Sequence, residues 1–536
     1  MSKFKRLVIY TTAVVISIVL LTAISGVQGK LDGLIKKHEL RYTGQIKNAP
    51  PIVAFTTMAL GSFRGLLADL LWLRAASLQD QGNYFEMVQL ASWITKLQPR
   101  FSGATAYLAW NMAYNISVTC SDFADRWRWI NRGIELIRDE ALEYNPSDPM
   151  LYKELGWIFQ HKIGNVLDDA NLFYKNKLAI GITEIVGSNP DWGKLAAAPK
   201  DYDAFLKKYP KDSKFWKTLK EAGFNTYEDF FNTYTDSGKL PEKFVQDLND
   251  PTLLDHLRDY FQAEWLRKKY KLDPRLIVKI NEEYGTLDWR LPEAQAIYWA
   301  TKGLEATSSH RDISCERMIT QSLKDAFMSG RLLSIDDEKY ASIVTVPNLD
   351  VVDSVLRTFQ EAYEKNDKQN SFRSAKLNFM KDAIVTLFNY GRYKKADEIY
   401  KDLRKEEPGK YRLKLEPFVM KEWAEDVRDS TSKKATDVIS GLILRSINYL
   451  LYNDIDAALA QEKMARYIWT SYMRYNADTK ARTGLAPYSE IKKSVVESYM
   501  KNLPPTLSKQ LKARIDQLQQ KKKEGKKEED KSSTGK

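Results

Sequence analysis

The same spacing of glycine, tyrosine and proline occurs at two widely separated places in this chain. Gly82 is followed by Tyr84 and, 17 residues after the glycine, by Pro99; Gly391 is followed by Tyr393 and, after the same 17 residues, by Pro408. Glycine tolerates the tight or left-handed backbone between two short helices. Proline cannot continue a helix and so ends the unit. Both stretches therefore predict helical hairpins, with the tyrosine starting the packing face of the second helix.

Helical periodicity is common elsewhere in the sequence, and strand patterns are sparse. Leu66, Leu70, Leu73 and Ser77 share one face at a 3.6-residue period. The 536 residues exceed the ~250–300 at which a single core usually stops growing. Hydrophobic residues make up 43% and aromatic residues 12%, so the chain has a packed interior. We expect an all-α fold, organised as two packed regions or as an elongated array.

The hairpin pattern resembles the tetratricopeptide repeat (TPR) family, with its W-x2-L-G-x2-Y, A-x3-F and P signature. Tyr152-x2-Leu155-Gly156-x2-Phe159 matches the first half, Ala396-x3-Tyr400 followed by Pro408 matches the second, and Asn453–Ala458 repeats the turn more weakly. Ala170-x3-Tyr174 comes late, and Met87 replaces a small residue. The stretch 60–175 also resembles membrane-anchored TPR-like proteins of the bacterial envelope. The resemblance implies a TPR-like α-solenoid but no activity, and an ordinary helical bundle is the competing interpretation.

The N-terminus has the pattern of a membrane anchor. Basic residues in 1–6 precede an uncharged run over 7–28, long enough to span about 30 Å of hydrocarbon as a helix. The run exceeds an ordinary signal-peptide core, so we favour an uncleaved signal anchor over a removed signal peptide. The basic segment should stay in the cytoplasm. We therefore expect a single-pass protein of the inner membrane, with most of the chain on the periplasmic or outer side.

Changes in composition divide the rest of the chain. We expect a linker over 29–50, TPR-like helical repeats over 51–180, an irregular helical insertion over 181–290 and a second helical region with TPR-like repeats over 291–503. Residues 504–536 should hold the end of the last helix and a disordered basic tail. Charges interrupt the apolar stretch 52–76, so it suits the first helix of the domain, lying close to the bilayer, better than a second span. Aromatic residues of the insertion suit a local core better than a contact patch.

Charge and motifs argue against several functions. The formal charge is +12, but both signs are interspersed, and no basic stripe of a nucleic-acid binder appears. Phosphate-binding and hydrolase motifs are missing from the sequence, and adjacent acids such as Asp168 and Asp169 are typical of solvated surface. His310, Asp312 and Cys315 make a weak metal set. Cys120 and Cys315 suit buried free thiols better than one disulfide. We expect no enzyme activity, cofactor or metal.

Several polar and aromatic residues are candidates for binding a partner. Asn111 and Asn115 share one helical face and could hold an extended peptide or bridge neighbouring helices. We favour the bridging role. Hot-spot residue types cluster at Arg126, Trp127, Arg128 and Trp129, although Arg126 and Trp129 could instead form a cation–π pair within the fold. Asp288 and Arg290 could recognise a charged ligand, but a local ion pair just before a helix that starts at Pro292 is favoured.

Together these features predict a membrane-anchored scaffold or adaptor. Its TPR-like groove would bind peptides or subunits of other envelope proteins, in a secretion or pilus-type assembly. The alternative is an envelope enzyme acting on glycan or peptidoglycan, with the repeats as accessory. An open groove lined by aromatic and amide side chains would favour the first, and a deep pocket with two facing carboxylates the second.

Overall fold

A computed structural model describes residues 63–97, 101–306, 312–334, 343–365, 368–428, 432–475 and 485–517, together with eight scattered positions between Thr12 and Leu34. Within this described part, no helix is both long enough and apolar enough to cross a bilayer. The predicted anchor, 7–28, lies almost wholly outside the described residues, as do Pro99, His310 and the basic tail from Lys521 onward. The anchor therefore stays a prediction.

The first helices form the hairpins that the sequence predicts. Their bounds are α3 (Phe63–Asp80), α4 (Tyr84–Leu97), α5 (Ser102–Trp110), α6 (Phe123–Glu135), α7 (Leu142–Tyr144), α8 (Pro149–Trp157) and α9 (Asn171–Val186). Gly82 lies in the turn between α3 and α4 with a φ of +72°, a backbone conformation that glycine adopts without steric cost. The expectation that Gly82 lies at a hairpin bend is confirmed. Tyr84 packs edge-on against Trp129 of α6.

Three of these helices continue into π-helical turns. They are η1 (Asn111–Ile116) after α5, η3 (Leu136–Ala141) after α6 and η4 (Ile158–Ile163) after α8, and a short 3₁₀ turn, η2 (Ser117–Thr119), follows η1. A π-turn inserts an extra residue into the helical ladder and is frequent at functional sites. Asn115 lies on η1, and His161 and Lys162 lie on η4, so the π-helical geometry sets the direction of these three side chains.

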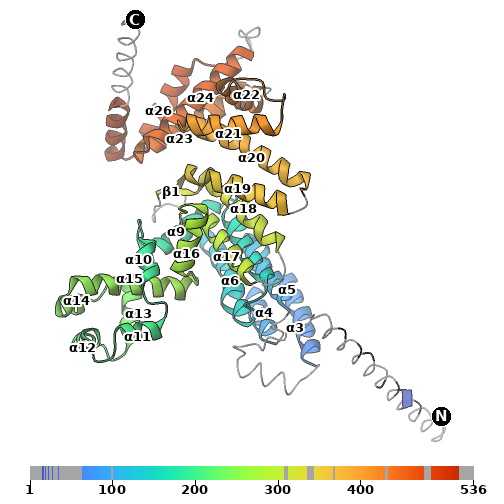
Figure 1. Cartoon of the computed structure of the whole chain (residues 1–536), viewed down its shortest axis with the longest axis vertical. Coiled ribbons are helices and arrows are strands. Elements are labelled where there is room, and N and C mark those ends of the chain that lie inside the picture. The colour runs from blue at the N-terminus through green and yellow to red at the C-terminus, as the bar shows by residue number, and fades with distance from the viewer. Residues whose placement is uncertain are drawn as a thin grey trace.

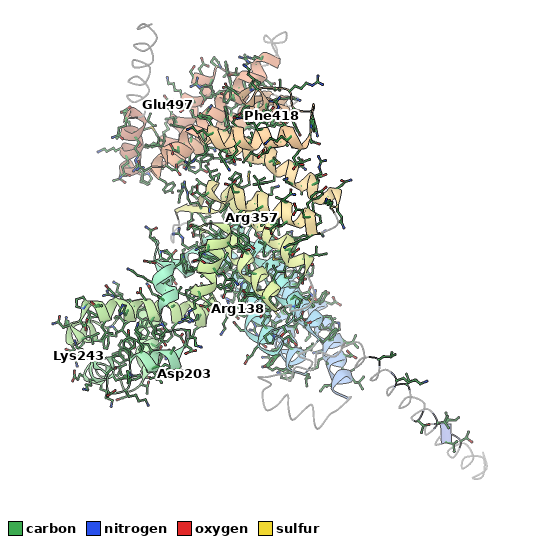
Figure 2. The ribbon with its side chains drawn as sticks, in the orientation of Figure 1. Arg138, Asp203, Lys243, Arg357, Phe418 and Glu497 are labelled. Atoms are coloured by element: carbon green, nitrogen blue, oxygen red, sulfur yellow. The ribbon has the colours of Figure 1, made fainter. Side chains whose placement is uncertain are left out.

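The predicted insertion folds into six short helices and one of 20 residues, and many of them begin at or directly after Pro or Asp. They are α10 (Trp192–Ala197), α11 (Tyr202–Lys208), α12 (Lys214–Glu221), α13 (Tyr227–Ser237), α14 (Glu242–Leu248), α15 (Pro251–Tyr270) and α16 (Pro274–Tyr284). Helices α11–α14 and part of α15 project to one side of the molecule (Figure 1), where Figure 2 labels Asp203 and Lys243. Phe205, Phe215, Phe230 and Phe261 are fully buried there and contact one another, so the predicted aromatic core is confirmed.

Two long helices join the hairpins to the C-terminal half. Helix α17 (Pro292–Ala306) is buried on nearly all sides and packs on α8 and on α18 (Ile313–Ser329). Gly156 of α8 allows this close packing, since a Cβ there would lie 3.3 Å from the Ala296 carbonyl oxygen of α17. A two-stranded antiparallel hairpin follows, β1 (Arg331–Ser334) and β2 (Val344–Val346). It is a small exception to the all-α expectation, and all three residues of β2 are β-branched.

The C-terminal half consists of further helices. After η5 (Leu349–Val351) they are α19 (Val352–Lys365), α20 (Asn370–Asn389), α21 (Tyr393–Glu406), α22 (Leu415–Arg428), α23 (Ser432–Leu451), α24 (Ile455–Tyr475) and α26 (Tyr488–Asn502), with one more helix over 505–517. Gly391 has a φ of +73° in the turn before α21, as predicted, and Ala396 is fully buried. Asn453 also has a positive φ, between α23 and α24. The molecule is thus largely helical, and its packed helices are compatible with a helical repeat.

The leucine face of the first helix does not point into the core. The helix predicted around Leu66, Leu70 and Leu73 is present, but these side chains are exposed by 57%, 55% and 65%. The opposite side of α3 is buried instead, through Ala68, Ala75 and Leu78 among others. Both sides of α3 are apolar, so periodicity alone could not tell which of them packs.

Candidate functional site

Asn111 and Asn115 bridge elements of the first hairpins. Asn111 is fully buried on η1, and its Oδ1 accepts hydrogen bonds from Nδ2 of Asn115 at 2.6 Å and from Nε2 of Gln79 at 3.2 Å. The second bond joins η1 to α3. Asn115 lies four residues further along η1 and is exposed. The pair thus has the geometry of an interhelical bridge, and of the two amides only Asn115 is accessible to a partner.

The Arg–Trp cluster of α6 is divided between the interior and the surface. Arg126 donates to Oδ1 of Asp169 at 2.6 Å and to the Cys120 carbonyl oxygen at 2.7 Å. Its guanidinium lies over Phe123, 5.5 Å from the ring centroid. The predicted cation–π pairing of Arg126 with Trp129 is therefore wrong, because the ion pair with Asp169 directs the arginine elsewhere.

The other three residues of that cluster also differ from one another. Trp127 stacks on Tyr174 of α9 at 6.2 Å between centroids, and Trp129 packs against the aromatic rings at the start of α4. Both indoles therefore hold neighbouring helices together. Arg128 is exposed and forms an ion pair with Asp125 of the same helix, at 2.9 Å. Of the four predicted residues, Arg128 is the one that faces solvent.

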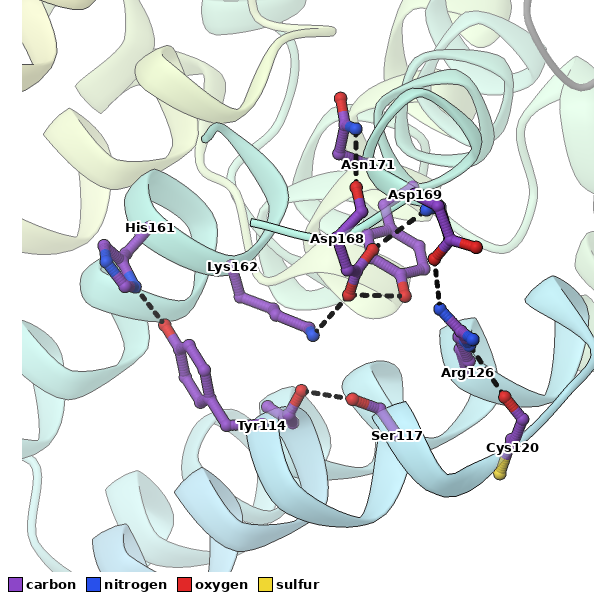
Figure 3. A network of polar contacts seen from close by, with 12 residues as sticks. Tyr114, Ser117, Cys120, Arg126, His161, Lys162, Asp168, Asp169 and Asn171 are labelled. Carbon is purple, nitrogen blue, oxygen red and sulfur yellow. Dashed lines mark hydrogen bonds and ion pairs between the residues drawn. The ribbon is translucent and has the colours of Figure 1, made fainter. Parts of the chain in front are cut away.

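Next to the Arg–Trp cluster lies a polar network centred on Lys162 (Figure 3). Lys162 is 2% exposed, and its Nζ forms an ion pair with Oδ2 of Asp168 at 2.8 Å. That carboxylate also accepts from the Tyr174 hydroxyl at 3.2 Å, and the ammonium lies over the Tyr114 and Tyr174 rings at 5.7 and 5.6 Å. Burial, followed by the nearby Asp168 charge, raises the pKa of Tyr174.

The network attaches the segment before α9 to the hairpins. The Tyr114 hydroxyl lies 3.2 Å from Nδ1 of His161, whose pKa is lowered by burial and by the Lys162 charge. The expectation that Asp168 and Asp169 are a solvated acidic pair is wrong for Asp168, whose carboxylate is largely buried and satisfied by Lys162. The charges of Lys162 and Asp168 neutralise each other, and the network has the features of a structural junction.

Aromatic rings form a row across the first three hairpins. Consecutive members lie 4.4 to 6.4 Å apart between centroids. Two of them are exposed, Tyr107 and Trp110. The row runs through Trp72, Tyr107, Trp110, Tyr114, His161 and Trp157. The rings come from α3, from α5 with η1, and from α8 with η4. The exposed rings of the row offer a limited apolar surface.

Asp288 and Arg290 form the local ion pair that the sequence analysis favoured. The guanidinium donates to both carboxylate oxygens of Asp288, at 2.8 and 2.7 Å. Asp288 also accepts from the backbone N–H of Leu332 at 3.0 Å, so it fixes the start of β1. Both side chains are largely buried, and their charged atoms are engaged within the fold.

Asp312 and Cys315, two members of the weak metal set, have structural roles. Asp312 caps α18 by accepting from the backbone N–H groups of Ser314 and Cys315, at 2.8 and 3.3 Å. Cys315 is fully buried, and burial raises the pKa of its thiol to about 12. No group of three or more metal-binding side chains occurs among the described residues, which do not include His310.

A cleft of about 980 Å³ lies in the C-terminal half; we call it the C-terminal cleft. It is bordered by β2, α20, α23 and α24, with α9, α18 and α22 at its margins. Its lining is mixed. Val385, Leu442 and Met464 are apolar, Tyr390 and Tyr449 carry hydroxyls, and Asn389, Asn448 and Gln461 carry amides. Sequence reasoning missed this cleft because its residues come from elements far apart along the chain.

Two amide oxygens of the C-terminal cleft are buried without a hydrogen-bond partner in the described chain. They are Oδ1 of Asn389 and Oε1 of Gln461. The Asn389 amide nitrogen has only a weak contact, 3.9 Å from the Met464 sulfur. A buried acceptor without a donor costs roughly 1–3 kcal/mol. The lining of the cleft thus contains two acceptors whose hydrogen bonding is incomplete.

Charges of both signs border the C-terminal cleft. Lys381 and Arg445 supply positive charge, and Asp382 and Glu422 supply negative charge. Asp382 is exposed and lies 3.6 Å from Nζ of Lys324 on α18. A rim that carries both signs of charge does not select for a ligand of one charge.

Comparison of the chain with protein-family models, curated proteins and solved structures gives no match in any of the three.

Proposed function

We propose that this protein is a membrane-anchored scaffold that acts by binding, and that its C-terminal cleft holds an extended segment of a partner protein. The observation that carries the proposal is the Asn389 side chain, which lies in the cleft with an unpartnered acceptor and a weakly engaged donor. A backbone peptide group offers one N–H and one C=O. An asparagine amide can pair with both groups at once.

The dimensions and lining of the cleft support this ligand class. Ligand sites usually enclose about 300–1,000 Å³, and this cleft lies at the upper end of that range. Val385, Leu442 and Met464 can receive small aliphatic side chains, while Gln461 offers a second acceptor further along. A ligand backbone N–H that donates to such an acceptor removes the cost of leaving it unsatisfied. The hydrogen bond therefore contributes more to the binding free energy than an ordinary surface hydrogen bond.

Cell-envelope placement and the TPR-like relationship are part of the same proposal. The apolar run over 7–28 and the basic residues before it support an inner-membrane anchor with the helices on the outer side. The hairpin turns at Gly82 and Gly391 support a degenerate TPR-like repeat. A tethered adaptor of this kind suits a subunit of a secretion or pilus-type assembly.

Site-specific photo-crosslinking in native membranes tests the proposal. A benzoylphenylalanine residue is placed in the full-length chain at Val385, which lines the cleft, or at Leu444, which is exposed on the same wall helix, α23, but does not line the cleft. We expect a reproducible protein adduct from position 385 and not from 444. Identical adducts from both positions, or none from 385, would contradict the proposal.

Asn389→Ala distinguishes binding from folding. Losing a bidentate amide contact should reduce the yield of the 385 adduct by about tenfold, which corresponds to about 1.4 kcal/mol of binding free energy. The thermal midpoint should stay close to that of the parent, because the Asn389 oxygen has no partner within the described chain. A large fall in the midpoint would instead show that Asn389 supports the fold.

A further inference from the structure

Large apolar side chains are exposed much more densely on the first hairpins than on the rest of the described chain. From Phe63 onward, ten exposed large hydrophobic residues lie between Leu66 and Val118, and only twelve are spread between Val166 and Leu507. Surface hydrophobic residues scattered singly are ordinary. A concentration at one end of the molecule indicates a surface with a partner.

The clearest part of this surface is one face of α3, formed by Leu66, Leu70 and Leu73, which we call the leucine face. These residues follow an i, i+4, i+7 spacing and so form a single stripe about 10 Å long. Each side chain is more than half exposed. The core of the hairpin uses the other side of α3, so the leucine face does not stabilise the described fold.

The position of α3 along the chain identifies the occupant. Residues 29–62 separate the predicted membrane span from the first residue of α3, and Ile52–Phe63 carry no charge. A domain tethered by so short a segment has a high effective concentration at the bilayer surface, so even a weak affinity for lipid is sufficient. Charged residues border the leucine stripe: Asp69 is exposed beside it, and Arg74 is exposed and forms an ion pair with Glu86 at 3.2 Å. An interfacial helix commonly carries charges beside its apolar face.

We propose that the leucine face of α3 lies in the interfacial layer of the same bilayer that holds the predicted anchor, with the three leucines among the upper acyl chains. This inference rests on the anchor of the proposed function. It also fixes an orientation, because α3 lies toward one end of the molecule's long axis, whereas α20, α23 and α24, which border the C-terminal cleft, lie toward the other (Figure 1). The cleft would face away from the lipid, accessible to a partner.

Fluorescence of a label on the leucine face tests this placement in the full-length chain. The environment-sensitive dye NBD is attached at Leu70→Cys in a Cys120→Ser background, where the remaining Cys315 is fully buried. The protein is placed in nanodiscs of phosphatidylcholine and phosphatidylglycerol, with or without lipids that carry a doxyl quencher near the headgroup. A matched control carries the dye at Leu413→Cys, an exposed position between α21 and α22.

We expect a blue-shifted emission at position 70 that doxyl lipid quenches severalfold, and a water-like, unquenched emission at 413. A blue shift without lipid quenching would overturn the inference, and would indicate a cover formed by this chain or, if it depends on protein concentration, by a second copy. A water-like emission at 70 in protein retained on the discs would overturn it while leaving the anchor intact. Failure of the chain to remain with the discs would overturn the anchor, and this inference with it.

Discussion

Glu293 is a carboxyl group that the fold keeps from ionising at its ordinary pH. It lies in the first turn of α17, is 5% exposed, and has one oxygen without a hydrogen-bond partner in the described chain. Burial raises its pKa from 4.5 to about 7; the charge of Lys175 opposes the rise, and those of Asp325 and Asp288 add to it. The helix dipole ordinarily favours an ionised glutamate at a helix N-terminus. Burial outweighs that effect here.

The sign of the resulting pH dependence follows from proton binding. Between about pH 4.5 and 7 the folded chain holds a proton on Glu293 that the unfolded chain has released, so the free energy of unfolding falls as the pH rises through this range. The total loss is about 3 kcal/mol, at about 1.4 kcal/mol for each pKa unit. Glu293→Gln cannot ionise. The variant should therefore be more stable than the parent by up to about 3 kcal/mol at pH 8, with no such gain near pH 4.5.

Hydrogen exchange of the α17 amides, compared between parent and variant at the same pH, measures this difference locally. Comparing at equal pH cancels the intrinsic pH dependence of exchange. Glu305→Gln on the same helix is the matched control, because Glu305 forms a partly exposed ion pair with Lys279 at 2.7 Å and should contribute less than about 1 kcal/mol. Equal protection of parent and Glu293→Gln at pH 8, or a gain that does not change between pH 5 and pH 8, would refute the reasoning.

Three further predictions concern the hairpins and the cysteines. Gly133→Ala should lower the free energy of unfolding by about 2 kcal/mol in denaturant titrations, because the new Cβ would lie 2.7 Å from the Ala109 carbonyl oxygen; an unchanged midpoint would contradict this close contact. Lys162→Met should cost about 3 kcal/mol or more, since it leaves Asp168 buried without its ion-pair partner, and adding Asp168→Asn should restore part of the loss. Maleimide should modify Cys120 in the folded protein but reach Cys315 only after unfolding, as peptide mass spectrometry would show; equal rates would disagree with the burial of Cys315.

The helical hairpins could be predicted because their determinants are local. A glycine that must adopt a positive φ, as Gly82 and Gly391 do, leaves a mark at one sequence position. The aromatic interior of the projecting helices was predictable for a similar reason, since phenylalanine at helical spacing is seldom left in water. The all-α class follows from many such local signals, and the short β1–β2 hairpin is too brief to produce a comparable one.

Sites that depend on distant contacts could not be predicted in this way. Asp168 looked like a solvated acid because its partner, Lys162, is separated from it by a turn whose course the sequence does not reveal. Arg126 was paired with a neighbour on its own helix, whereas the structure pairs it with Asp169. The C-terminal cleft combines α20 with α23 and α24, and no motif marks its amides. The leucine face was visible as a pattern, but its direction was not.

The polar network and the C-terminal cleft can be told apart by how fully their polar atoms are satisfied. Lys162 and Asp168 neutralise each other, and Asp168 accepts further hydrogen bonds from Tyr174 and a backbone N–H. A ligand could only compete with those bonds, so the network is suited to holding the hairpins in one arrangement. In the cleft, Asn389 and Gln461 keep acceptors that the described chain leaves unused, and a ligand would complete them. For this reason the proposed binding site is the cleft, whereas the network joins α9 to the hairpins that precede it.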